Sequence, residues 1–303
     1  MLELRHITKV FSPGTTDEKK ALDDVSLHAL PGDFITIIGA NGAGKSTLFN
    51  AIAGSFITDS GDLLLDGEDI TLMPEHKRAK RIGRLFQDPM RGSAPGMTIE
   101  ENLALAAGRG GWLRPVSRAE KQRFRDRVAL LGMGLEDRMR QPVGLLSGGQ
   151  RQALTLMMAT FHPPKLLLLD EHTAALDPAT AEKVLTLTQD IVRENHLTCL
   201  MITHNMRSAL QLGNRTLMMH AGRIVMDVSG AEREKLAVDD LLLRFKEISG
   251  SALDNDRMLL ILKYKEAHLR EPPFSLSKKS FWTFLTSCLQ NCKINICSII
   301  LQF

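Results

Sequence analysis

The stretch FITIIGANGAGKST, residues 34–47, decides the fold of this chain. Its first five residues form a largely apolar run, which is typical of a strand buried on both faces of a parallel sheet. A glycine-rich loop follows, and residues 46–53 contain helix-forming side chains with no breaker before Gly54. A strand, a loop and a helix in this order predict an α/β core with a mostly parallel sheet.

The loop at residues 39–47, GANGAGKST, satisfies the pattern G-x-x-x-x-G-K-[ST] and indicates a P-loop NTPase core. Its three glycines allow backbone conformations in which successive N–H groups point at phosphate oxygens. The ammonium of Lys45 can reach the β- and γ-phosphates, and the hydroxyl of Ser46 can coordinate Mg²⁺. We therefore expect ATP and Mg²⁺ as cofactors, with the nucleotide bound by Gly39, Ala40, Asn41, Gly42, Ala43, Gly44, Lys45, Ser46 and Thr47.

A second apolar run, KLLLLD at residues 165–170, leads into two consecutive carboxylates. Because open α/β sheets bind ligands at the carboxyl ends of their strands, we expect both carboxylates beside the phosphate loop. Asp170 is predicted to hold Mg²⁺, and Glu171 to polarise the attacking water. An isolated Asp-Glu pair at a strand end is more often a solvated turn, but the upstream phosphate loop favours the catalytic interpretation.

The rest of the chain supplies the layers around this core. The sequences LELRHITKVF and ALDDVSLHA alternate with period two and are bounded by Pro-Gly turns, so they predict an N-terminal antiparallel β subdomain. Residues of about 88–160 predict a helical subdomain inserted into the core. Beyond it the pattern predicts a helix over 178–194, strands over 197–203 and 223–228, and a closing helix over 232–248.

Composition limits the possible partners. The 303 residues are 44% hydrophobic with a formal net charge of +3, which provides no basic field for nucleic acid, so no nucleic-acid partner is expected. The basic run at residues 76–81 is interpreted as a solvated helix face. No run approaches the roughly 18 apolar residues of a membrane helix, and no signal peptide is recognisable. The four cysteines match neither a zinc pattern nor a disulfide framework.

The C-terminal end differs in composition from the rest of the chain. We expect an ATPase domain over residues 1–250 and a C-terminal extension over 251–303. Within the extension, residues 261–303 hold six Lys/Arg against two Glu, together with the chain's only tyrosine, Tyr264. This atypical tail is interpreted as a small accessory module, a partner-binding segment or the product of a shifted reading frame, and we favour the last. Loss of folding or ATPase activity on removing the residues after Leu260 would contradict that preference.

The sequence LSGGQ at residues 146–150 lies about twenty residues before Asp170 and resembles the signature of the ABC ATPase family. A serine hydroxyl and glycine amides that open a helix form a second anion cradle, although such a sequence alone could be a simple helix cap. The resemblance covers about residues 1–250. It implies that the signature contacts the γ-phosphate of ATP held by an opposite subunit, through Ser147, Gly148, Gly149 and Gln150.

Other motifs of the family follow in order. The resemblance implies that Gln87, in RLFQDP, senses Mg²⁺ and water, and that Asp177, in AALDP, lies at the dimer interface. His204, in MITHN, matches the histidine that hydrogen-bonds the γ-phosphate, although an isolated histidine is more often structural. Phe11 matches the aromatic residue that stacks on adenine, with a strand-core role as the alternative. His172 departs from the proline or alanine common after the glutamate, with no expected loss of catalysis.

The spacing of these motifs separates subgroups of the family. Chromosome-maintenance types insert long coiled coils between the phosphate loop and the signature, whereas only 60 residues separate Gln87 from Ser147 here. Translation-associated types carry two cassettes, and excision-repair types carry zinc sites. The chain therefore fits a stand-alone transport ATPase better than any of these three types.

Within the family, the sequence of residues 14–54, which begins GTTDEKKALDDVSLHALPGD, and the sequence DEHTAALDP at residues 170–178 resemble those of bacterial ATPases of tryptophan, tyrosine or related amino-acid uptake, systems similar to branched-chain amino-acid importers. This resemblance implies a second ATPase subunit, a separate transmembrane permease and an extracytoplasmic solute-binding protein. It also implies a peripheral location on the cytoplasmic face of the membrane. A separate-chain exporter and a non-transport regulatory ATPase remain the alternatives.

Overall fold

The computed structural model describes residues 1–108 and 116–249. The strands are β1 (Leu2–Phe11), β2 (Lys19–Ala29), β3 (Phe34–Gly39), β4 (Ser60–Leu65), β5 (Glu68–Asp69), β6 (Ile82–Leu85), β7 (Leu166–Asp170), β8 (Thr198–Ile202), β9 (Arg215–His220) and β10 (Arg223–Ser229). The helices are α1 (Lys45–Ala53), α2 (Glu75–Arg78), α3 (Ile99–Ala106), α4 (Arg118–Ala129), α5 (Gly148–Ala159), α6 (Pro178–Glu194), α7 (Met206–Gln211), α8 (Gly230–Glu234) and α9 (Val238–Ser249).

The central sheet has six strands in the order β10-β9-β3-β8-β7-β6. All neighbouring pairs are parallel except β9 with β10, which confirms the mostly parallel sheet. Every residue of β3 is buried, and so are the four leucines of β7, as expected for strands covered on both faces. The end of β7 pairs with the end of β8, so the residues that follow both strands emerge at one edge of the sheet.

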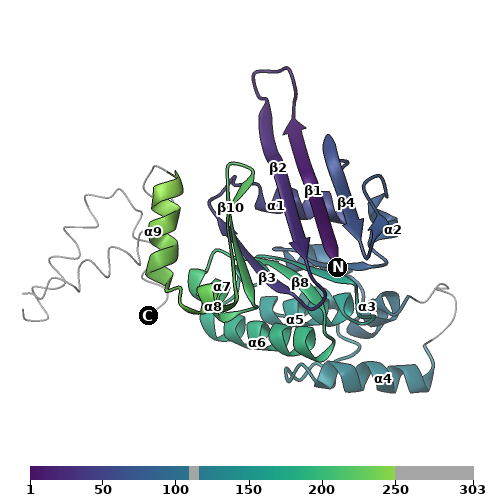
Figure 1. Cartoon of the computed structure of the whole chain (residues 1–303). Coiled ribbons are helices and arrows are strands. Elements are labelled where there is room, and N and C mark those ends of the chain that lie inside the picture. Colours follow the sequence, from purple (N-terminus) through teal and green to yellow (C-terminus); the bar gives the residue numbers. More distant parts are fainter. Residues whose placement is uncertain (109–115, 250–303) are drawn as a thin grey trace, which may run out of the picture. The chain divides into compact units, whose positions relative to one another are not determined.

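The N-terminal strands form a separate antiparallel sheet in the order β2-β1-β4-β5, which confirms the predicted β subdomain. Figure 1 shows β1, β2 and β4 side by side. One cluster of buried apolar side chains joins this sheet to the central one and takes members from β1, β2, β3, α1, β7 and β8. Helix α1 is therefore held in the core that the two sheets share.

Helices α3, α4 and α5 follow β6 and precede β7, so the helical insertion is confirmed. They enclose a core of their own, which includes Leu103, Phe124, Val128 and Leu154. All three helices begin with a capping box, in which a serine or threonine accepts from the third backbone N–H of the helix and a Glu or Gln side chain bonds back. The insertion is thus a compact layer with well-defined helix starts.

One basic side chain in the run at residues 76–81 is buried, which corrects the interpretation of that run as a solvated face. Arg78 is 1% exposed, and its guanidinium donates to the carbonyls of Ala51 and Ile52 at 2.8 and 2.9 Å. It also donates to the carbonyl of Met73 at 2.7 Å. The last carbonyls of a helix have no partner within the helix, so at the end of α1 a buried cation satisfies them.

The closing helix predicted over 232–248 is wrong, because two helices, α8 and α9, occupy this segment. Arg233 holds α8 against the end of α7 by donating to the carbonyls of Ala209, Leu210 and Leu212. A new helix then starts where the Asp240 carboxylate accepts from the Ala237 N–H at 2.8 Å.

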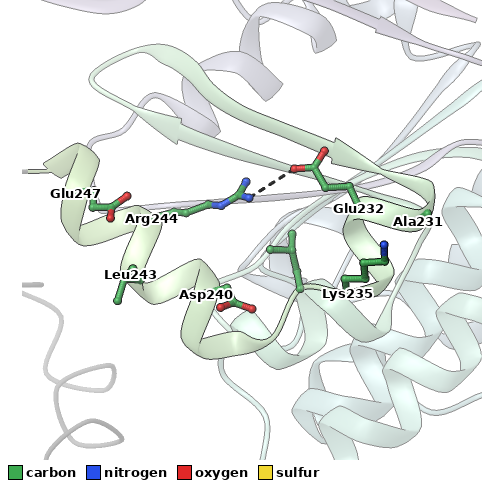
Figure 2. A pocket seen from close by; sticks show the side chains of 8 residues that line it. Ala231, Glu232, Lys235, Asp240, Leu243, Arg244 and Glu247 are labelled. Atoms are coloured by element: carbon green, nitrogen blue, oxygen red, sulfur yellow. Dashed lines mark ion pairs between the residues drawn. The ribbon is translucent and has the colours of Figure 1, made fainter.

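A hollow lies between α8 and α9. Figure 2 shows its lining, in which Glu232 and Arg244 form a 3.5 Å ion pair. This hollow contains none of the predicted site residues.

The extension over 251–303 and its atypical tail lie outside the described residues, as do three of the cysteines. Cys199 is buried and free in β8. Within the described part of the chain, no helix is both long and apolar enough to cross a membrane.

Candidate functional site

The phosphate loop joins β3 to α1 and is held by backbone contacts that only glycine permits. Gly39, Gly42 and Gly44 have φ values of 152°, 78° and 101°. A Cβ on Gly39 would lie 2.3 Å from the carbonyl oxygen of Met219, and one on Gly44 would lie 2.6 Å from that of Ala21. The loop therefore packs tightly against β9 and β2.

Lys45 is the first residue of α1 and is only 5% exposed. Its ammonium donates to Gly39 O at 2.7 Å and to Ala40 O at 2.9 Å, across the loop. Burial lowers the pKa of Lys45, and the nearby carboxylates of Glu171 and Asp170 oppose that shift. The loop, the lysine and both predicted carboxylates therefore form one electrostatic site.

The two carboxylates stand where β7 ends. The side chains of Asp170 and Glu171 are 13% and 11% exposed. Burial raises the pKa of Asp170, the Glu171 carboxylate raises it further, and the cations of Arg84 and Lys45 oppose both effects. Glu171 has a φ of 46°, and its N–H donates to Ile202 O at 3.1 Å, so the chain turns sharply at this residue.

His204 follows β8 and meets Glu171 across the sheet edge. Its Nε2 lies 2.5 Å from Oε1 of Glu171. Its Nδ1 is buried and has no hydrogen-bond partner within the described residues. The pairing of Asp170 with Ile202 between β7 and β8 explains why residues so far apart in sequence meet here.

The signature forms the start of α5 and packs against the start of α6. Ser147 caps α5, and its hydroxyl accepts from Gln150 N at 3.3 Å. A Cβ on Gly149 would lie 2.0 Å from Cγ2 of Thr180, so glycine is required here for packing. Asp177 caps α6 by accepting from Thr180 N at 3.1 Å. Ser147 and Asp177 are both exposed, so the signature and the AALDP motif present one accessible surface.

Gln87 and Phe11 occupy exposed positions on different elements. Gln87 follows β6, one residue after Phe86, whose ring centroid lies 4.7 Å from the guanidinium carbon of Arg84. Phe11 ends β1 with 39% of its surface exposed, and it meets Phe56 edge-to-face with 5.5 Å between ring centroids. A strand-core role for Phe11 does not fit this exposure.

Two further polar residues at the site are not singled out by sequence reasoning. Arg84, in β6, donates to Oδ1 of Asn50 at 2.7 Å and lies 4.0 Å from Asp170. Gln152, in α5, is 1% exposed and donates to the carbonyl of Phe86 at 3.5 Å. The lone charged residue in the strand sequence IGRL could have indicated Arg84 as a site residue, whereas a single polar residue within α5 gives no such indication for Gln152.

His172 is buried behind the site. It is 3% exposed, and its Nε2 lies 3.2 Å from the hydroxyl of Thr188, which donates to Val184 O at 2.8 Å. Since the Thr188 proton is used for Val184, the imidazole acts as donor from Nε2. Burial lowers the pKa of His172 to about 4. The histidine is therefore neutral in the folded protein near neutral pH.

This burial predicts a loss of stability in acid. In the unfolded chain His172 gains a proton near its usual pKa of 6.5, whereas in the folded chain it stays neutral until about pH 4. Between these values the unfolded state binds more protons, so the free energy of unfolding falls as pH falls, by roughly 2 kcal/mol between about pH 6.5 and 5. Urea unfolding of His172→Gln should show a correspondingly weaker pH dependence than the wild type. His76→Gln, at an exposed histidine, is the control, and an unchanged pH dependence in His172→Gln would contradict the assignment.

Comparisons with known proteins agree with this geometry. Residues 22–174 match the ABC transporter family. The chain belongs to that family. It is accordingly an ATPase, and the resemblance based on LSGGQ is confirmed. A tyrosine transport ATP-binding protein of Clostridioides difficile (strain R20291) is 42% identical over 248 residues, which cover 81% of this chain and 99% of that protein.

Other similar proteins include a methionine import ATP-binding protein of Corynebacterium efficiens, 41% identical over 74% of this chain and 61% of its own length. Among solved structures, a dimeric ATP-binding cassette in a post-hydrolysis state with ADP and Pi aligns with a TM-score of 0.65 and 26% identity, covering 76% of this chain and 98% of that one. An ATP-binding cassette of an ABC transporter in its ADP conformation aligns with a TM-score of 0.68 and 28% identity, covering 82% and 98%. These alignments confirm the P-loop NTPase fold.

Proposed function

We propose that this ABC ATPase powers the uptake of an amino acid through a separate permease, as one of two cassettes that share their ATP sites. The observation that supports the ATPase chemistry of this proposal most directly is the convergence of Lys45, Asp170, Glu171 and His204 beside the phosphate loop. It provides a cation for phosphate, a carboxylate for a metal and a base for water. All three are needed for hydrolysis of ATP.

The nucleotide would lie on the loop at residues 39–47. Backbone N–H groups and the start of α1 favour phosphate, and Lys45 would exchange its loop carbonyls for phosphate oxygens. Phe11 would offer its exposed ring to adenine.

Three side chains fit a divalent cation at this site. Ser46, Asp170 and Gln87 offer oxygen atoms of the kind that Mg²⁺ prefers. The raised pKa of Asp170 fits a carboxylate that a cation would stabilise in its charged form. Mg²⁺, when bound, would neutralise charge on the phosphates.

Glu171 would orient and polarise the attacking water. It is largely buried and contacts His204, which holds its carboxylate at a defined position. His204 would move its Nε2 from Glu171 to the γ-phosphate when nucleotide arrives, since one ring nitrogen cannot donate fully to both. Gln87 would transmit the binding of nucleotide to the helical insertion. It directly follows Phe86, whose carbonyl accepts a hydrogen bond from Gln152 of α5.

The signature would complete the site of a second cassette. Ser147 and Gly148 are exposed at a helix start, where an anion is stabilised by N–H groups and the helix dipole. Asp177 lies on the same accessible surface. ATP bound between the phosphate loop of one cassette and the signature of the other would draw the cassettes together, and hydrolysis would release them.

A negative charge introduced at the signature tests the shared site. Ser147→Asp keeps a good helix cap but places a carboxylate where phosphate would bind, so ATP should no longer convert monomers to dimers in light-scattering measurements. Ser117→Asp is the matched control, because Ser117 caps α4 through the same kind of capping box. ATP-dependent pairing in Ser147→Asp equal to that of the control would contradict the proposal.

The transport assignment rests on the similar proteins, whose names include tyrosine transport and methionine import. By this likeness the partners would be transmembrane permease subunits and, through them, an extracytoplasmic solute-binding protein. The ATPase would then sit at the cytoplasmic face of the membrane.

Copurification tests this assignment, because a transport ATPase should bring a membrane permease with it, whereas a regulatory ATPase should not. Radiolabelled tyrosine or methionine uptake in a deletion strain would separate an importer from an exporter.

A further inference from the structure

A second lysine, Lys19, lies beside the phosphate loop. Its Nζ is 3.7 Å from the position that a Cβ would occupy on Gly42. Gly42 is exposed at the middle of the loop, and Lys19 is exposed in β2. The ammonium therefore stands next to the accessible side of the loop where phosphate would bind.

The backbone fixes this placement. Lys19 pairs with Phe11 in the antiparallel ladder of β1 and β2, so the lysine lies directly opposite the aromatic residue. Two residues later, the carbonyl of Ala21 lies close against Gly44 of the loop. The start of β2 thus runs from the aromatic residue to the phosphate loop, and Lys19 occupies the interval between them.

Lys19 also has an unneutralised charge. The neighbouring Lys20 pairs with Asp23, and Lys9 pairs with Asp59. Within residues 1–108 and 116–249, the Lys19 ammonium has neither a hydrogen bond nor an ion pair. A free cation next to a loop of phosphate-binding amides attracts a polyanion, and no carboxylate of the described residues competes for it.

We infer that Lys19 is a nucleotide-binding residue whose ammonium contacts the phosphate chain of ATP held at the loop. This inference rests on the proposed binding of ATP at residues 39–47. The lysine adds affinity for nucleotide and takes no part in the reaction of water, since Glu171 and His204 follow β7 and β8. Its effect is therefore on binding rather than on the rate of a saturated enzyme.

Equilibrium binding of ATP to the full chain, with Lys19→Gln and Lys20→Gln compared, tests the inference. We expect Lys19→Gln to weaken ATP binding by about three- to tenfold and to raise KM equally, with kcat within about twofold of wild type. Lys20→Gln should bind as wild type, because that charge is already paired. The difference should shrink as salt is raised from about 50 to 500 mM, which a structural defect would not produce.

Other outcomes of these measurements would contradict the role of Lys19. Unchanged affinity in Lys19→Gln, or equal weakening in both variants, would overturn the inference while leaving ATP binding intact. Wild-type protein that binds no ATP would instead overturn the proposed function, and the inference with it. Lys19→Arg should restore most of the affinity, because it keeps the charge.

Discussion

Glu171→Gln is expected to bind ATP as wild type but to lose at least about 100-fold of its turnover, the usual contribution of a general base. The amide has nearly the same size as the carboxylate, so the largely buried site should keep its shape. It cannot take a proton from water, however. Steady-state phosphate release and equilibrium ATP binding measure the two effects separately.

The variant should also accumulate as an ATP-bound pair, because the step that reopens the cassettes is blocked. Glu194→Gln is the control, since Glu194 is exposed at the end of α6 and is not among the site residues. Turnover of Glu171→Gln equal to that of this control would remove Glu171 from the proposed role.

Lys45→Ala is expected to weaken nucleotide binding itself, by at least about 30-fold, since loss of one partner of a buried charge contact typically costs about 2 kcal/mol or more. The buried ammonium already contacts the loop carbonyls of Gly39 and Ala40, where the phosphates would lie. Fluorescence competition with ATP would measure the loss.

A second substitution separates charge from packing. Lys45→Met keeps a long side chain at this buried position, so it should unfold at nearly the wild-type temperature and still fail to bind ATP. Lys246→Ala, at an exposed lysine of α9, is the control. Near-normal affinity in Lys45→Met would show that the ammonium is not needed.

Much of the core follows from local sequence. The unit of β3, the loop and α1 was predictable because burial, glycine conformation and helix propensity all favour the same structure there. The apolar run of β7 and the acids that follow it were predictable for the same reason. Helix α6 was predicted over its observed range, 178–194.

Features that depend on contacts between residues far apart in the sequence were harder to predict. Strand β9 was not predicted, although its four central residues are buried like those of the neighbouring strand β3. The break between α8 and α9 depends on Arg233 reaching α7, and the burial of Arg78 depends on carbonyls at the end of α1. In the cases of Arg233 and Arg78, a long side chain satisfies backbone groups that are remote in sequence, which periodicity cannot reveal.

A hydrogen bond from Gly222 N to Ala43 O, 3.0 Å long, ties the phosphate loop to the turn after β9, and Asp23 N donates in turn to Gly222 O at 3.0 Å. Two separate segments, the turn after β9 and the first half of β2, thus hold the loop in shape before any ligand arrives. The loop therefore loses little conformational entropy when a ligand binds, so little of the free energy of the ligand's contacts is spent on ordering the loop. Loosening this turn should therefore weaken the binding of ATP without removing a single group that touches it.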